Sequence, residues 1–164
     1  MQRGIDVRAF ASQATLAPEL AAAVSDDLRR AINARGRARL AVSGGTTPVP
    51  FFTALRQADL DWSRVAVTLV DERWVDADHP DSNAALVRRH LLVGAAAGAT
   101  FQPLKNAAAS AADGCLRANS LVSPLCPLDV AVLGMGADGH TASWFPGASN
   151  LAQALDADRS ACCV

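Results

Sequence analysis

Apolar residues recur at every fourth position in the N-terminal part of the chain. The series is Leu16, Leu20, Val24, Leu28 and Ile32, with charged residues between its later members. Because an α-helix turns once in about 3.6 residues, this spacing places the apolar side chains on one face. The pattern predicts an amphipathic helix over about residues 15–34, which Gly36 then ends.

Short apolar runs alternate with helical patterns over the rest of the chain. The runs at 39–43, 65–70 and 128–133 are nearly continuous, which is typical of strands that are covered on both faces. Residues 99–104 favour a further short strand. Helical spacing appears at 82–92 and again at 106–122, where Gly114 weakens the pattern.

A glycine turn and another helical pattern follow the first of these strands. Phe51, Phe52 and Leu55 have helical spacing, and Thr47 and Pro48 suit the N-cap and the first helical position. Strands and helices therefore alternate along the chain. We predict an α/β fold, a Rossmann-like open and mostly parallel sheet with helices on both faces, as a single domain over residues 1–164.

The composition argues against several classes of partner. The chain has 15 basic and 16 acidic residues and a formal net charge of -1, so no overall field favours nucleic acid or an anionic membrane. The longest apolar stretch, 91–99, is about half of the roughly 20 residues that cross a bilayer, and we see no secretory leader. The four cysteines form no CxxC pair, which favours buried, reduced thiols in a cytoplasmic protein.

The glycine turn after the first predicted strand offers a local anion site. Ser43, Gly44, Gly45 and Thr46 are small residues that let backbone N–H groups approach a ligand, and their hydroxyl groups add donors. The start of the next helix adds positive potential. A phosphate or a carboxylate would suit this turn. It matches neither a Walker A loop nor GxGxxG, and a purely structural turn is the alternative.

Charged residues follow the second predicted strand directly. If the backbone stays extended, Asp71 and Arg73 share one face of the strand and Glu72 points to the other. Arg73 can then bind an anionic substrate, and Asp71 can position a polar group or transfer a proton. An ion pair that braces the loop is the alternative.

The richest cluster follows the run at 128–133. Three glycines, among them Gly136, bend the backbone beside Asp138 and His140, which stand two positions apart. Histidine accepts protons near neutral pH, and a neighbouring carboxylate orients its ring, although a structural histidine is the alternative. We find no metal-ligand spacing and no GxSxG nucleophile elbow, so we expect no metal and the direct activation of water.

All three clusters follow the carboxyl ends of predicted strands. Ligands of open parallel sheets bind in the crevice outside those ends, so we expect the clusters to meet in one site. Outside them, His79 and His90 stand beside charged residues and are expected in solvent. Trp74 and Trp144 are expected in the core or at its rim.

Together the clusters resemble the motifs of the 6-phosphogluconolactonase family. The motifs are SGGTTP at 43–48, DERWV at 71–75 with Asp81, Ser82 and Asn83 downstream, and GMGADGHTAS at 134–143 followed by Phe145 and Pro146. Their order and spacing match over about residues 40–146. The resemblance implies the Rossmann-like fold that this family shares with glucosamine-6-phosphate deaminase.

The resemblance also implies a reaction, the hydrolysis of 6-phospho-D-glucono-1,5-lactone to 6-phosphogluconate in the oxidative pentose phosphate pathway, without a cofactor. His140 would be the general base, and Asp71 and Asp138 would orient His140 or the sugar hydroxyls. The implied substrate-binding and phosphate-binding set is Ser43, Gly44, Gly45, Thr46, Arg73, Asn83 and Gly136. The partner would be a sugar phosphate lactone, and a cytoplasmic monomer is favoured.

Two alternatives stay open. The deaminase and isomerase branch shares the Asp-Gly-His core but typically continues into Asn-Glu-Pro, whereas Phe145 is the fifth residue after His140 here. The other alternative is a truncated, non-catalytic fragment that binds a sugar phosphate. Family members usually run further, and this chain stops inside an apparent strand, so we expect the C-terminal portion of the domain to be lacking.

Overall fold

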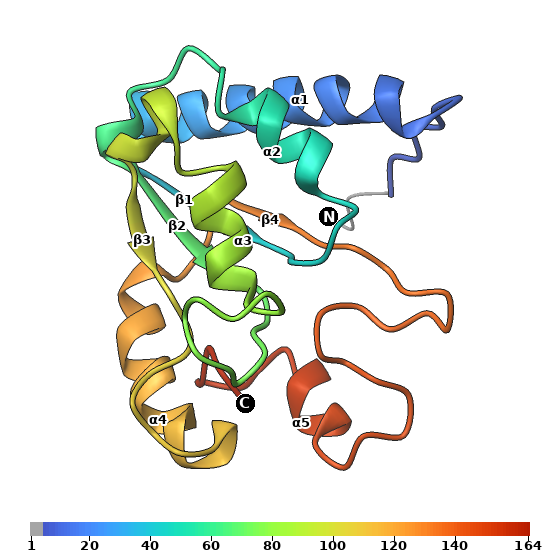
Figure 1. The fold of residues 1–164 in the computed structure, drawn as a ribbon, viewed down its shortest axis with the longest axis vertical. Helices are drawn as coiled ribbons and strands as arrows, with labels where there is room; N and C mark the ends of the chain where they lie inside the picture. The colour runs from blue at the N-terminus through green and yellow to red at the C-terminus, as the bar shows by residue number, and fades with distance from the viewer. Residues whose placement is uncertain (1–4) are drawn as a thin grey trace.

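The computed structural model describes residues 5–164, in which strands and helices alternate (Figure 1). The helices are α1 Gln13–Arg35, α2 Val49–Leu55, α3 Asn83–His90, α4 Ala111–Val122 and α5 Leu151–Leu155. The strands are β1 Ala38–Val42, β2 Val65–Leu69, β3 Thr100–Gln102 and β4 Val130–Val132. Residues 1–4, part of the stretch searched for a leader, lie outside the described residues.

The four strands form one parallel sheet in the order β3-β2-β1-β4. β1 lies in the interior of the sheet, where Leu40 pairs with Val67 of β2 and with Val130 of β4. The predicted α/β class with an open parallel sheet is confirmed. Because the strands are parallel, the carboxyl ends of the neighbours β2, β1 and β4 lie at one edge of the sheet.

Helix α1 has well-defined ends. Ser12 caps its start by accepting a hydrogen bond from the Thr15 N–H, and Gly36 ends it in the left-handed conformation with φ 73°. The predicted helix is confirmed, two residues longer at its start. Leu28 is fully buried on its inner face, whereas Leu16 stays 38% exposed because it borders the cavity described below.

The main core lies on one face of the sheet, under α1, α2 and α3. Leu28 of α1, Phe52 of α2 and Val87 of α3 are fully buried there. They pack with inward-facing strand residues such as Leu40 and Val67. Each of these large side chains contributes about 1.5–3 kcal/mol by leaving water, so this packing fixes the strand ends that carry the site.

The opposite face of the sheet is more open. Helices α4 and α5 lie on that side (Figure 1), across a cavity of about 960 Å³ that Ala41, Thr68 and Ala131 line from the sheet. The expected burial of the run at 128–133 on both faces is wrong: only Val130–Val132 forms a strand, and Ala131 is exposed. The reason is that β4 is an edge strand whose second face borders this cavity.

Helix α2 begins one position later than predicted. Pro48, rather than Thr47, is the N-cap, because the Phe52 N–H donates to the Pro48 carbonyl and starts the helical ladder there. Pro50 occupies the first turn. The glycine turn after β1 is therefore longer than the sequence indicates.

Helix α4 is shorter than the pattern at 106–122. Ser110 caps it at residue 111, while the Asn106 side chain accepts a hydrogen bond from the Ala108 N–H and so forms a turn before the helix. Gly114 is the position where the Trp74 ring packs, since a Cβ there would lie 2.3 Å from that ring. Trp74 is half-buried, in agreement with the predicted place at the rim of the core.

Candidate active site

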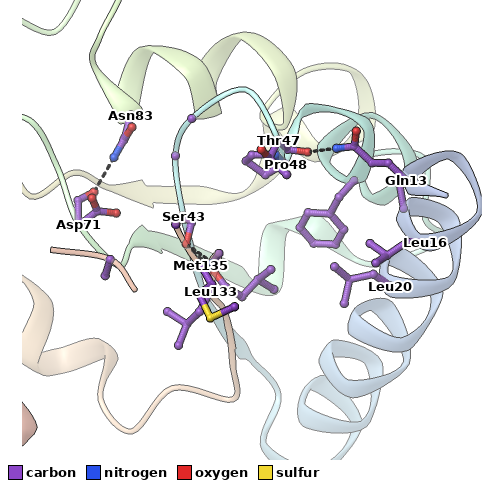
Figure 2. Close-up of a pocket in the computed structure, with 18 of the residues that line it drawn as sticks. Gln13, Leu16, Leu20, Ser43, Thr47, Pro48, Asp71, Asn83, Leu133 and Met135 are labelled. Carbon is purple, nitrogen blue, oxygen red and sulfur yellow. Dashed lines mark hydrogen bonds between the residues drawn. The ribbon is translucent and has the colours of Figure 1, made fainter. Parts of the chain in front are cut away.

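The segments that follow β1, β2 and β4 surround a cavity of about 690 Å³ (Figure 2). The expected site residues that line it are Ser43, Gly44, Gly45, Asp71, Arg73, Asn83, Gly136 and His140. The structure thus brings the three sequence clusters together. Thr46 and Asp138 are not among the lining residues; Thr47 lines the cavity, and Asp138 lies beside His140.

The turn after β1 borders the cavity with Gly44, Gly45 and Thr47. Within the described part of the chain, the N–H groups of residues 44–47 donate to no backbone acceptor. Gly45 adopts φ +84°, which residues with a Cβ rarely do. The start of α2 supplies fewer donors than expected, because Pro48 and Pro50 have no N–H group.

A buried amide joins this turn to the segment after β2. Asn83 is only 2% exposed, and its Nδ2 donates a hydrogen bond of 3.0 Å to the Asp71 carbonyl (Figure 2). Its Oδ1 approaches Gly44 so closely that a Cβ there would lie 1.7 Å away. Position 44 therefore has room for glycine alone as long as Asn83 keeps this place.

Ser43 connects the ends of β1 and β4. Its hydroxyl donates to the Val132 carbonyl and accepts from the Gly134 N–H, both at 3.1 Å. The Ser43 N–H donates to the same Val132 carbonyl. These bonds hold the glycine turn against the segment that leads to His140.

Asp71 and Arg73 both line the cavity, as the extended geometry predicts. The Arg73 side chain is exposed, and its Nη1 donates to the Asp81 carbonyl at 2.8 Å, which leaves further guanidinium donors for an anion. Burial raises the pKa of the Asp71 carboxyl above its ordinary value, while the charge of Arg73 opposes this rise and that of Glu72 adds to it. The Ser143 hydroxyl and His140 also favour the charged form of Asp71.

Glu72 has a role that sequence reasoning missed. Its carboxylate accepts hydrogen bonds of 2.8 Å from the backbone N–H groups of Arg73, Asn83 and Ala84, and its Oε2 lies 3.3 Å from the Ser82 hydroxyl. It therefore satisfies donors at the start of α3, where a negative charge is also favourable. No local pattern reveals this contact, because Asn83 and Ala84 stand eleven and twelve positions further along the chain.

His140 forms a hydrogen bond with Asp138 through one of its two ring nitrogens. Its Nδ1 lies 2.5 Å from Asp138 Oδ1, and this hydrogen bond lowers the pKa of the Asp138 carboxyl. An ionised carboxylate only accepts, so Nδ1 carries the proton and the lone pair of the neutral ring lies on Nε2. No hydrogen bond engages Nε2 within residues 5–164, and His140 is one of the residues that line the cavity. A water molecule next to Nε2 can therefore lose a proton to it.

The cavity has an apolar end that the sequence analysis did not assign to the site. Phe10, Leu16, Leu20 and Phe51 are among its lining residues. Figure 2 shows Leu16 and Leu20 of α1 on the far side of the turn from Asp71 and Asn83. Gln13 ties this end to the turn, since its Nε2 donates to the Thr47 carbonyl at 2.6 Å. The helical spacing of the two leucines predicts an inner face but does not distinguish core from cavity wall.

Other expectations can be compared with the described residues. No cluster of three potential metal ligands occurs among them, and none of their helices is long and apolar enough to span a membrane. The four cysteines are free thiols, though half-buried rather than buried. His79 is exposed, as expected, whereas His90 is half-buried.

Comparison with known proteins shows the family of the chain. The family model described as glucosamine-6-phosphate isomerases/6-phosphogluconolactonase matches residues 11–164. A 6-phosphogluconolactonase from Pseudomonas putida is 49% identical over 152 residues, which are 93% of this chain and 63% of that protein. One from Pseudomonas aeruginosa is 48% identical over 162 residues, 98% of this chain and 68% of that protein.

A solved structure shows that the fold is also that of this family. The crystal structure of a 6-phosphogluconolactonase from Shewanella baltica superposes with a TM-score of 0.90 at 46% identity and covers 94% of this chain and 66% of that chain. The chain therefore belongs to the family of glucosamine-6-phosphate isomerases and 6-phosphogluconolactonases, on its 6-phosphogluconolactonase branch. It spans about two thirds of the length of these relatives.

Proposed function

We propose that this chain hydrolyses 6-phospho-D-glucono-1,5-lactone to 6-phosphogluconate, with His140 as the general base. The observation that carries the proposal is the open Nε2 of His140, with Asp138 on Nδ1, in the same cavity as Arg73 and the free N–H groups of the glycine turn. The relatives described above are 6-phosphogluconolactonases, which supports the same reaction.

The proposed reaction begins with a water molecule beside His140. As its oxygen attacks the lactone carbonyl carbon, a proton moves to Nε2, and the Asp138 carboxylate stabilises the imidazolium that forms. The tetrahedral intermediate then collapses with cleavage of the bond between the carbonyl carbon and the ring oxygen. The imidazolium returns its proton to that oxygen, so the histidine is restored and the product is an open-chain acid.

We infer that the phosphate of the substrate binds at the end of the cavity formed by the turn after β1. We assign it to the backbone N–H groups of Gly44 and Gly45, which line the cavity, and of the adjacent Thr46, since none of the three donates to a backbone acceptor within residues 5–164. Arg73 supplies a fixed positive charge and paired donors. Such local recognition accounts for anion binding by a chain whose net charge is -1.

The remaining expected residues bind the sugar or position other parts of the site. We assign Asp71 to the sugar hydroxyls, because its carboxyl lines the cavity. Ser43 holds the glycine turn through the hydrogen bonds described above, and Asn83, bonded to the Asp71 carbonyl, lies against Gly44, so both residues position that turn. Gly136 allows the His140 ring to lie against the backbone, since a Cβ there would lie 2.2 Å from the ring.

An amino-sugar-phosphate deaminase or isomerase is the less favoured enzyme. That reaction needs a further acid–base residue beyond His140, and the fifth residue after His140 is Phe145, which offers none. The phosphate site described above serves either substrate. The difference between the two reactions therefore lies at the histidine end of the cavity.

We also propose that the protein works as a monomer in the cytoplasm, in carbohydrate metabolism. Its four cysteines are free thiols, which fits a reducing compartment. No cofactor is needed for the proton transfers proposed here.

The proposal is tested by following freshly generated 6-phosphogluconolactone with and without the protein. We expect hydrolysis faster than the spontaneous reaction, weaker acceleration with unphosphorylated gluconolactone, and no ammonia release from glucosamine 6-phosphate. Loss of lactone at the spontaneous rate, together with measurable binding of 6-phosphogluconate, would instead support the binding-only alternative. Ammonia release would support the deaminase.

A further inference from the structure

The His140 ring is in contact with an aromatic side chain outside the cavity. The Phe145 and His140 ring centroids are 4.6 Å apart and the two rings are inclined by 29°, a stacked arrangement. Phe145 is not among the residues that line the cavity, and it is 48% exposed. Its clearest contact is therefore with the histidine, not with a bound sugar.

The backbone confines the same imidazole ring at Gly136. A Cβ at position 136 would lie 2.2 Å from Cε1 and 2.3 Å from Nδ1 of His140, so the backbone there approaches the ring closely. The Gly136 N–H also donates to the His140 carbonyl at 2.8 Å, which closes the loop that carries both residues. Together with the Asp138 hydrogen bond, these contacts restrict how the ring can tilt and turn.

We propose that Phe145 is a positioning residue, whose aromatic ring holds the imidazole of His140 in the orientation that directs Nε2 into the cavity. This inference rests on the proposed function, because it assigns Phe145 a part in the same proton transfer. The imidazole ring turns about its Cβ–Cγ bond, and the Asp138 hydrogen bond and the Gly136 backbone restrict this turn only at the edge that carries Nδ1 and Cε1. A flat partner against the ring removes that freedom, and an aliphatic side chain of similar size does so less well.

The first test is steady-state kinetics of Phe145→Leu and Phe145→Tyr. Leucine fills much of the space without a flat face, so we expect kcat to fall by about 2- to 13-fold, the size of an aromatic contact, with KM unchanged. Tyrosine keeps the ring and should restore kcat to the wild-type value. Phe101→Leu is the matched control, since Phe101 is half-buried in β3 and does not line the cavity.

A purely structural role of Phe145 gives a different pattern of kinetic constants and melting temperature. If Phe145 only braces its loop, Phe145→Leu lowers the melting temperature while kcat and KM stay at the wild-type values, and the proposal is overturned. A rise in KM with kcat unchanged also overturns it, because it would mean that Phe145 contacts the substrate.

The second test does not depend on turnover. The ring of Phe145 should shift the NMR signal of the His140 Cε1 proton, which is assigned by its disappearance in His140→Gln. We expect this signal to move in Phe145→Leu and to stay near its wild-type position in Phe145→Tyr. If the wild-type protein has no lactonase activity, the proposed function fails, and an unmoved signal separately refutes the contact between the two rings.

Discussion

At the scale of single residues, Asp71 holds a carboxyl group in an environment that disfavours its charge. Burial raises the pKa of Asp71 in the folded protein above its unfolded value, even though Arg73 opposes this rise. Above the folded pKa the group is ionised in both states and the cost of burial is fully present. As the pH falls from the folded pKa towards the unfolded pKa, the carboxyl of the folded protein takes up a proton. The free-energy cost of burying its charge then disappears.

Asp71→Asn should therefore stabilise the protein near neutral pH while it weakens turnover of the lactone. The gain in free energy of unfolding should shrink as the pH falls towards the ordinary pKa of an aspartate, about 4. Urea unfolding at several pH values measures this. Asp78→Asn, in an exposed loop, is the control and should change stability by less than about 0.5 kcal/mol. A gain for Asp71→Asn that is independent of pH would refute the burial argument.

Gly44 tests the close approach of the Asn83 side chain. Gly44→Ala places a Cβ 1.7 Å from Asn83 Oδ1, which is held because the same amide bonds to the Asp71 carbonyl. We expect a loss of about 1–3 kcal/mol in the free energy of unfolding, as for other overpacked sites. Gly134→Ala is the control, since nothing lies within 4 Å of a Cβ there. Equal stability of the two variants would contradict the geometry.

The sequence predicted the site residues in the segments that follow strand ends, because the carboxyl ends of parallel strands bring these segments to one edge of the sheet. Arg73 and His140 are of this kind. The contacts of Glu72 with α3 and of Phe145 with His140 were not predicted. They depend on how the backbone turns between the partners, and no periodicity of apolar residues encodes such turns.

At the scale of elements, strong apolar periodicity predicted a helix well, whereas the exact starts of other helices were predicted less well. The series that contains Val24 and Leu28 predicted α1, since five apolar residues at helical spacing fix a helix with little ambiguity. The start of α2 was misplaced by one residue and that of α4 by five, because side-chain hydrogen bonds and prolines decide those starts. The extent of β4 depends on its edge position in the sheet, which sequence order alone does not give.

The start of α3 depends on Glu72, and its removal should be costly. Glu72→Ala leaves the backbone N–H groups of Asn83 and Ala84 without their acceptor, so we expect a loss of about 1–3 kcal/mol in the free energy of unfolding. We also expect a higher KM, since Arg73 belongs to the same segment. Glu19→Ala removes only an exposed ion pair with Arg8 and should cost less than about 1 kcal/mol. Similar losses in both variants would argue against the capping role.

At the scale of the whole molecule, the packed side of the sheet carries most of the stability. The fully buried large residues, Leu28 and Phe52 among them, lie under α1, α2 and α3, while the other face borders a cavity of about 960 Å³. The α/β class was predictable because strands and helices alternate along the chain. The difference in burial between the two faces of the sheet was not predictable, because it depends on how closely each helix packs.

Leu28→Ala tests this distribution of the core. The side chain is fully buried, so its truncation should cost about 2–5 kcal/mol in the free energy of unfolding. Leu116→Ala, on α4, is the matched control: that side chain is 82% exposed and should change stability by less than about 0.5 kcal/mol. Urea unfolding followed by circular dichroism measures both, and equal losses would contradict the assigned core.

The most direct test of the account is the turnover of freshly generated 6-phosphogluconolactone by the wild-type chain and by His140→Gln. Glutamine keeps a polar side chain of similar length but cannot accept the proton, so kcat should fall by about 10²- to 10⁴-fold while 6-phosphogluconate still binds. His79→Gln, an exposed histidine away from the cavity, should retain full activity. Equal rates for the wild-type chain and His140→Gln would contradict the assignment of His140 as the general base.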